Sequence, residues 1–259
     1  MNTMTHNSRQ RGLTLIEIMV ALVISLFLLA GLLQLFIGTR QSARIQENLS
    51  RVQENGRYAI NYLGRVIRLA GYRSKETIKQ GDSFEERFNI SPIQDNVSKL
   101  SDSDSKMPTI IFEGENTGEG EVRDCLNQLI TSLPGAPVIA SNTIKINTTD
   151  STLQCQTSTN TQTIVDGVED IYVLYGENTD GDLLGVADRY VSGPIVSDWK
   201  KVVSVRISLL LRTSENNLAE SPQPYTFKGV STTPSPVNGI PDRRLRRVFT
   251  TTITLRNRV

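Results

Sequence analysis

The stretch Arg11-Gly-Leu-Thr-Leu-Ile-Glu-Ile-Met-Val20 opens a long apolar run near the start of the chain. From Leu13 to Ile37 the run has 25 residues, with one acid, Glu17, and no Lys or Arg. Roughly 20 apolar residues are enough for a helix to cross the hydrocarbon core of a membrane. A carboxylate inside such a segment is costly in lipid, so we treat Glu17 as a functional residue. The flank before the run is basic, which predicts a cytoplasmic N-terminus and a globular part outside the cytoplasm.

The helical pattern continues past the apolar run. No proline occurs between Leu13 and Tyr72, and from Ile45 to Ala70 apolar residues step by three and four along one face. The opposite face is rich in Arg and Glu, and Gly71 supplies a stop. We therefore expect one helix of about 60 residues, about 90 Å long. Its amphipathic half has a single apolar stripe, which needs a sheet to cover it.

Alternating apolar and polar residues in the rest of the chain predict strands of an antiparallel sheet. The expected fold class is α+β, a long N-terminal helix packed on this sheet. We divide the chain into residues 1–12, a leader; 13–38, the membrane half of the helix; 39–72, its amphipathic half; and 73–259, a β-rich globular domain. The expected strands are 108–113, 138–140 and 143–147 (as a hairpin about Ser141-Asn142), 168–175, 203–211, an edge strand at 225–228, and 245–255.

Composition argues against an enzyme. The only histidine is His6, so the part beyond Gly12 has no His-based triad, no His-ligated zinc and no His proton shuttle. There is also no Gly-x-Ser-x-Gly elbow and no phosphate loop. The net charge is +1, which does not indicate a general polyanion binder. We expect a non-enzymatic protein with no cofactor.

The two cysteines, Cys125 and Cys155, are expected to form a disulfide, because an even pair in an exported domain usually does. The bond would close a loop of about 30 residues and contribute roughly 3 kcal/mol in the chain-entropy model. Its expected role is to fix the polar segment 148–163 to the loop around Cys125. The alternative is two separate buried thiols.

Two other clusters have less specific chemistry. Asn178, Asp180 and Asp182 place oxygen atoms at alternate positions, as in the start of a calcium loop, but Arg189 stands where a bidentate Glu is needed. We expect an Asp-Gly turn rather than a metal site, and keep these three residues as a calcium candidate only. The second cluster, residues 243–247, has four arginines. We expect a solvated strand end or a salt bridge to a neighbouring subunit, and no nucleic acid.

The order Gly12, then Leu13-Thr-Leu-Ile-Glu17, then an apolar helix resembles the N-terminus of type IV prepilins. The resemblance implies that a prepilin peptidase cuts between Gly12 and Leu13 and N-methylates Leu13, and that Glu17 takes part in filament assembly. The chemistry supports this role. Cleavage leaves an α-amino group that is charged at neutral pH and costly in an apolar core, and Glu17 of a neighbouring subunit can pair with it. The alternative is a signal anchor with an incidental acid.

The C-terminal part resembles the PilW family of type IV pilus minor pilins. The residues that carry the resemblance are Asp166–Gly176, Asn178–Asp182, Asp188–Tyr190, Trp199 with Val202–Arg212, and Arg246–Asn257. The family implies a low-abundance subunit that joins other minor pilins in a complex priming pilus assembly, near the tip and with a tip-associated adhesin.

The implied partners are prepilin peptidase, the major pilin, the other minor pilins and the assembly platform in the inner membrane. The implied location is the inner membrane, then the pilus at the cell surface, with roles in twitching motility and cell adhesion. Two alternatives remain open. One is a type II secretion pseudopilin, and the other is an adhesion or DNA-uptake module.

Overall fold

The computed structural model describes residues 14–73, 93–95, 108–116, 121–132, 138–180 and 185–258. It forms two units, of which the first ends at Glu47 and the second begins at Asn48. The described part of the first unit is helical from Leu15. The second unit contains the end of the same helix and every described strand.

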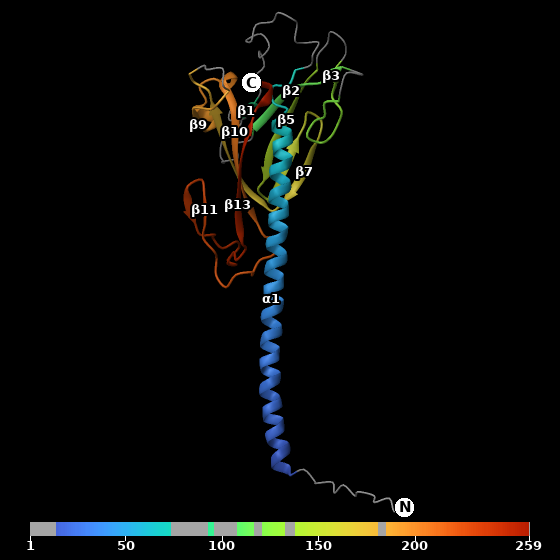
Figure 1. Cartoon of the computed structure of the whole chain (residues 1–259), viewed down its shortest axis with the longest axis vertical. Helices are drawn as coiled ribbons and strands as arrows, with labels where there is room; N and C mark the ends of the chain where they lie inside the picture. Colours follow the sequence, from blue (N-terminus) through green and yellow to red (C-terminus); the bar gives the residue numbers. More distant parts are fainter. Residues whose placement is uncertain are drawn as a thin grey trace, which may run out of the picture. The chain divides into compact units, whose positions relative to one another are not determined.

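Helix α1 runs from Leu15 to Ile67 without interruption (Figure 1). The expectation of one long helix is confirmed, although its 53 residues are fewer than predicted. Beyond Ile67 the chain continues in tight turns, and Gly71 adopts a positive φ of 72°. This left-handed conformation suits glycine because it has no Cβ. The amide of Gly71 donates to the carbonyl of Ile111 at 2.9 Å, so the turn after the helix is fixed to a strand.

The first sheet has five strands, and each pairs antiparallel with its neighbour. In spatial order they are β1 (Ile93–Asp95), β2 (Pro108–Glu113), β5 (Ile139–Asn147), β6 (Thr152–Gln156) and β7 (Thr161–Asp166). Two further short strands, β3 (Glu115–Asn116) and β4 (Thr131–Ser132), pair parallel with each other.

The second sheet has four antiparallel strands in the order β13-β10-β8-β9. They are β8 (Val168–Glu177), β9 (Arg189–Val191), β10 (Val202–Arg212) and β13 (Arg246–Thr254). A hairpin of β11 (Tyr225–Phe227) and β12 (Val230–Thr232) lies in the connection between β10 and β13. The 3-10 turns are η2 (Gly193–Ile195), η3 (Trp199–Lys201) and η4 (Arg256–Arg258).

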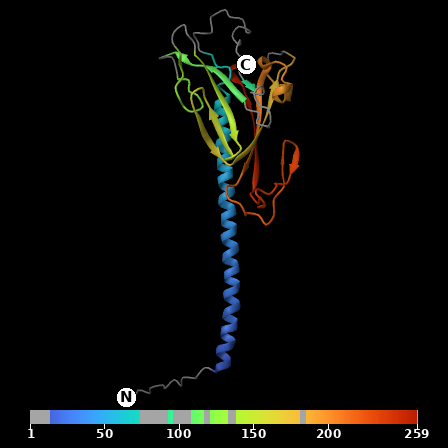
Figure 2. The ribbon, with the colours of Figure 1, turned by 180° about the vertical axis from the view of Figure 1, so that it is seen from behind.

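One hydrophobic core joins the second half of α1 to both sheets. The predicted apolar stripe supplies the helix side of this core: Val52, Leu63 and Ile67 are buried. Figure 2 shows the same part of the helix from behind, running along the strands. At Gly56 a Cβ atom would lie 2.4 Å from the ring of Phe249, so the absence of a side chain lets β13 approach the helix.

The expected hairpin about Ser141-Asn142 is wrong. These residues lie inside β5, which pairs with β2 on one side and with β6 on the other. Ser141 and Asn142 pair with Ile111 and Ile110 of β2, and the strand continues from Thr143 into its pairing with β6, so the sheet outweighs the local turn preference of Ser-Asn. The polar segment 148–163 also contains more strand than expected, since it forms β6 and the start of β7.

Candidate functional site

Glu17 lies in the first turn of α1, where it makes a reciprocal cap with Thr14. The amide and the hydroxyl of Thr14 each donate to Glu17 Oε2 at 3.0 Å, and the amide of Glu17 donates to Thr14 Oγ1 at 3.3 Å. This is a capping box, whose Thr-x-x-Glu signature was visible in the sequence but absent from our reading of it. The carboxylate that we assigned to assembly therefore also fixes where the helix begins.

The helix that follows Glu17 is unusual in having exposed apolar residues on all sides. From Leu15 to Ile37 its large apolar side chains are between 49% and 77% exposed within the described structure. By length and composition α1 is able to cross a membrane. The predicted cleavage and methylation positions, Gly12 and Leu13, lie outside the described residues. The site at Gly12 and Leu13 thus stays a prediction.

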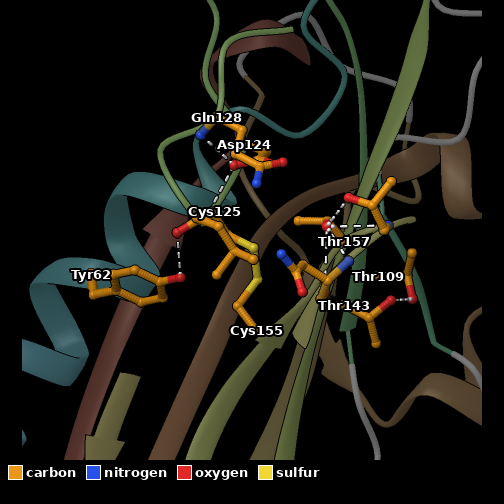
Figure 3. The surroundings of a disulfide bond; sticks show 11 residues. Tyr62, Thr109, Asp124, Cys125, Gln128, Thr143, Cys155 and Thr157 are labelled. Carbon is orange, nitrogen blue, oxygen red and sulfur yellow. Dashed lines mark hydrogen bonds between the residues drawn. A yellow bond between two sulfur atoms is a disulfide. The ribbon is translucent and has the colours of Figure 1, made fainter. Parts of the chain in front are cut away.

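The expected disulfide between Cys125 and Cys155 forms, and both cysteines are buried (Figure 3). It connects the loop around Cys125 to strand β6. The same loop is fixed to the helix, because the hydroxyl of Tyr62 donates to the carbonyl oxygen of Cys125 at 2.8 Å. Burial raises the pKa of Tyr62, so its phenol keeps the proton that this hydrogen bond needs.

The loop around Cys125 is also stabilised by hydrogen bonds within itself. The carboxylate of Asp124 accepts hydrogen bonds from the amides of Leu126 and Gln128, both at 2.8 Å (Figure 3). These bonds satisfy backbone donors in a segment that has few ladder partners. The described loop is therefore held at three points: its own carboxylate, the helix and, through the disulfide, the first sheet.

The calcium candidate is only partly within the described residues, because Asp182 is not among them. The carboxylate of Asp188 accepts from the amide of Thr179 at 2.6 Å and from the amide of Asp180 at 3.3 Å. These hydrogen bonds, the one from Thr179 first, hold the pKa of Asp188 below its ordinary value. No group of three His, Cys, Asp or Glu residues placed to hold a metal occurs in the described part of the chain. The turn at Thr179 is thus explained by Asp188.

In the arginine cluster, residues 243–247, the environment of Arg246 differs from the expectation. Arg246 is nearly buried and pairs with two acids of its own chain, with Nε 2.6 Å from Glu169 and Nη2 2.5 Å from Asp242. Arg212 also pairs with Glu169, and Arg244 with Asp242, each at 3.3 Å. Arg246 is therefore neither a solvated strand end nor free to bridge to a neighbouring subunit, whereas Arg247 is exposed. The pairing of β8, β10 and β13 brings these distant residues together.

A groove of about 630 Å³ lies over this ion-pair network. It is lined by the outer face of β8 and β10 together with the hairpin β11–β12 and the residues after it. Every charged side chain in the lining has an ion-pair partner among the described residues. Among the described residues that line the groove, charges of opposite sign are therefore paired with one another.

A second buried acid, Glu177, also has a structural role that the sequence reading missed. Its Oε1 accepts from the amide and the hydroxyl of Ser197, both at 2.7 Å, and its Oε2 lies 2.9 Å from Nη2 of Arg189. Burial alone would raise the pKa of Glu177, but the hydrogen bonds from Ser197 and Arg189 outweigh it and lower the pKa. The carboxylate thus stays ionised and holds the segment between β9 and β10.

The architecture is an N-terminal helix with an exposed apolar first half and a second half buried under antiparallel sheets, which is that of a type IV pilin-like subunit. Residues 7–33 match the family described as the prokaryotic N-terminal methylation motif. Residues 137–257 match the family described as Type IV Pilus-assembly protein W. The second match is to the PilW family that the sequence resemblance predicted, and together the two matches indicate a PilW-type pilin subunit.

Among solved structures, the chain is similar to a type IV-like pilin from Thermus thermophilus. The two are 16% identical with a TM-score of 0.41, and the match covers 83% of this chain and 97% of the other. A search of curated proteins finds no match.

Proposed function

We propose that the protein is a minor pilin that helps to initiate type IV pilus assembly, after a prepilin peptidase has removed residues 1–12 and methylated Leu13. Before assembly the protein is anchored in the inner membrane, with its N-terminus in the cytoplasm and the second unit in the periplasm. It then joins other minor pilins in a priming complex near the pilus tip and reaches the cell surface, where a tip-associated adhesin is a further expected partner.

The observation that carries this proposal is the position of Glu17 at the start of the exposed apolar helix. A carboxylate within an apolar assembly needs a partner of opposite charge, because a lone buried charge is costly. Oε2 of Glu17 accepts hydrogen bonds from Thr14, whereas Oε1 of Glu17 accepts no hydrogen bond from the described residues. In the assembled state the α-amino group of Leu13 from a neighbouring subunit is the partner that we assign to it.

The N-terminal segment also supports the proposed orientation of the protein in the membrane. The basic residues Arg9 and Arg11 precede the apolar run, and such residues stay on the cytoplasmic side. The disulfide supports a non-cytoplasmic second unit, since disulfides persist mainly in oxidising compartments. These observations favour the orientation with the C-terminal unit in the periplasm.

The test separates the charge of Glu17 from its capping role. Glu17→Leu removes both, whereas Thr14→Ala removes the cap and leaves the carboxylate. We expect Glu17→Leu to be found in the inner-membrane fraction, cleaved, and absent from sheared pili, while Thr14→Ala still enters them. Incorporation of Glu17→Leu at the level of the unaltered chain would refute the assembly role.

The priming role has its own test. Deleting the gene should leave few or no surface pili, and Gly12→Leu should fail to restore them because the leader stays attached. The mass of the purified protein reports the cleavage directly. Partners are identified by co-purification of the full chain, in detergent, with each of the other minor pilins and with the major pilin. Normal pilus numbers in the deletion strain would exclude priming.

A further inference from the structure

The second unit has exposed apolar side chains in the segment that connects β10 to β13. We name the segment Tyr225–Ile240 the flap; it contains the hairpin β11–β12 and the turn that follows it. Three apolar side chains of the flap are largely exposed: Val230 at 61%, Val237 at 57% and Ile240 at 59%. We propose that the flap rests on the surface of an anionic bilayer while the subunit is stored in the membrane.

The turn from Val237 to Ile240, at the end of the flap, has a fixed backbone conformation. Val237 and Ile240 exchange two backbone hydrogen bonds, of 2.9 and 3.0 Å, across the turn that Asn238 and Gly239 make. Both turn residues have positive φ, 51° and 77°, as a tight two-residue hairpin turn of type I′ requires. Two large apolar side chains are thus held at the end of a rigid turn, so their exposure does not result from a loose loop.

Contacts within the second unit place the flap near the residue where the chain enters this unit. Strand β13 runs in the same direction as the helix: Phe249 packs at Gly56, and the side chain of Asn257 donates to the carbonyl of Arg68 at 2.9 Å. The start of β13 therefore lies toward Asn48, whose side chain is 3.5 Å from the hydroxyl of Ser214. The flap lies in the connection between Ser214 and this start of β13.

The length of chain between the apolar segment and the second unit limits how far this end is from the bilayer. The apolar segment ends at Gly38, and the second unit begins at Asn48. These ten helical steps correspond to about 15 Å at 1.5 Å per residue. An end of the unit that is tethered this closely remains within reach of the membrane surface.

The charge of the segment fits an anionic lipid surface. Residues 221–247 contain five basic residues and one acid. Asp170 pairs with Lys228 and Glu169 with Arg246, but Arg247 is exposed beside the strand start. Apolar side chains that enter the interface next to cations are the combination that binds peripheral segments to anionic bilayers.

The experiment uses the full chain reconstituted into vesicles of phosphatidylethanolamine and phosphatidylglycerol. Both native cysteines are in the disulfide, so a fluorophore attached to an introduced cysteine is specific. The variants are Ile240→Cys and, as a matched control, Ile195→Cys, which is 63% exposed on η2 at the opposite end of the second sheet. Brominated lipids report contact with the bilayer by quenching.

We expect quenching at position 240 to exceed that at position 195 by about twofold or more, and to weaken at about 1 M salt, where the Debye length falls to about 3 Å. Arg247→Gln in the Ile240→Cys background should reduce the quenching as well. Equal quenching at 240 and 195 overturns the proposal. Val237→Cys gives a second position in the same turn if Ile240→Cys does not fold.

The inference rests on the membrane anchoring proposed above, and a probe at Leu26→Cys distinguishes the two. Strong quenching at position 26 without quenching at position 240 refutes flap contact and leaves the anchor intact. If position 26 is not quenched, the anchor itself is wrong and the flap proposal falls with it.

Discussion

Replacing Arg246 by methionine should destabilise the second unit strongly. The side chain of Arg246 is 5% exposed and neutralises Glu169 and Asp242, which are 17% and 4% exposed. Removing one partner of a buried ion pair typically costs about 3–5 kcal/mol, because the other charge is left without compensation. Since Arg212 and Arg244 remain beside the two acids, at 3.3 Å each, we expect the lower end, about 3 kcal/mol.

The assay is urea unfolding of the full chain in a mild detergent, followed by tryptophan fluorescence. The chain has a single tryptophan, Trp199, whose ring lies edge-on to Tyr175 with 4.8 Å between centroids. It therefore reports the second unit alone. With a slope of about 3 kcal/mol per M, a loss of about 3 kcal/mol lowers the midpoint by about 1 M. Arg247→Met, at the next and exposed position, is the matched control and should leave the midpoint unchanged.

The pH dependence gives an independent check. Burial raises the pKa of Asp242, but hydrogen bonds from Arg246 and from the amide of Arg244 outweigh it, so the pKa lies below its ordinary value. A carboxyl group with a lowered folded pKa stabilises the fold fully above its unfolded pKa, near 4, and this stabilisation is lost as the pH falls through the folded value. Arg246→Met should flatten this acid limb. An unchanged midpoint with an unchanged acid limb would refute the reasoning.

Three further changes have definite expected outcomes. Cys125→Ala with Cys155→Ala should lower the free energy of unfolding by about 3–4 kcal/mol, from a sequence separation of 30; urea midpoints with and without reductant check it, and a loss below about 1 kcal/mol contradicts it. Tyr62→Phe should cost about 1 kcal/mol by the same measurement, because the buried carbonyl of Cys125 loses its donor. Glu177→Gln should destabilise the fold above pH 5, where the carboxylate of Glu177 is ionised. Because glutamine does not titrate, the variant should also lack the part of the acid-induced loss of stability that comes from the lowered pKa of Glu177, as thermal unfolding across pH would show.

Repeating patterns in the sequence predicted the largest elements of the fold well. The three-and-four spacing from Ile45 to Ala70 predicted the buried stripe of α1, and the alternation after Val202 and Arg246 predicted two neighbouring strands of the second sheet. The disulfide was also predictable, since two cysteines permit one intramolecular pair. The helix stripe and the strand alternation are patterns within one local stretch of sequence, and the two cysteines have no alternative intramolecular partner.

The failures have a common physical cause. The wrong hairpin at Ser141-Asn142 came from local preference, whereas pairing of these two residues with the distant strand β2 decided the structure. The ion pair of Arg246 with Glu169 joins residues 77 positions apart, and nothing in either local sequence indicates it. The capping box of Thr14 and Glu17 is a different case, because its spacing was present in the sequence and its meaning was overlooked.

The parallel course of β13 and the second half of α1 determines how the subunit responds to tension. A pull on the helix from its N-terminal end acts along the line of contacts from Phe249 at Gly56 to Asn257 at Arg68 and Ala70. Such a pull slides the helix past the strand and strains these contacts together, instead of peeling them apart one after another. Several contacts between the helix and β13 must then break at once before the two separate.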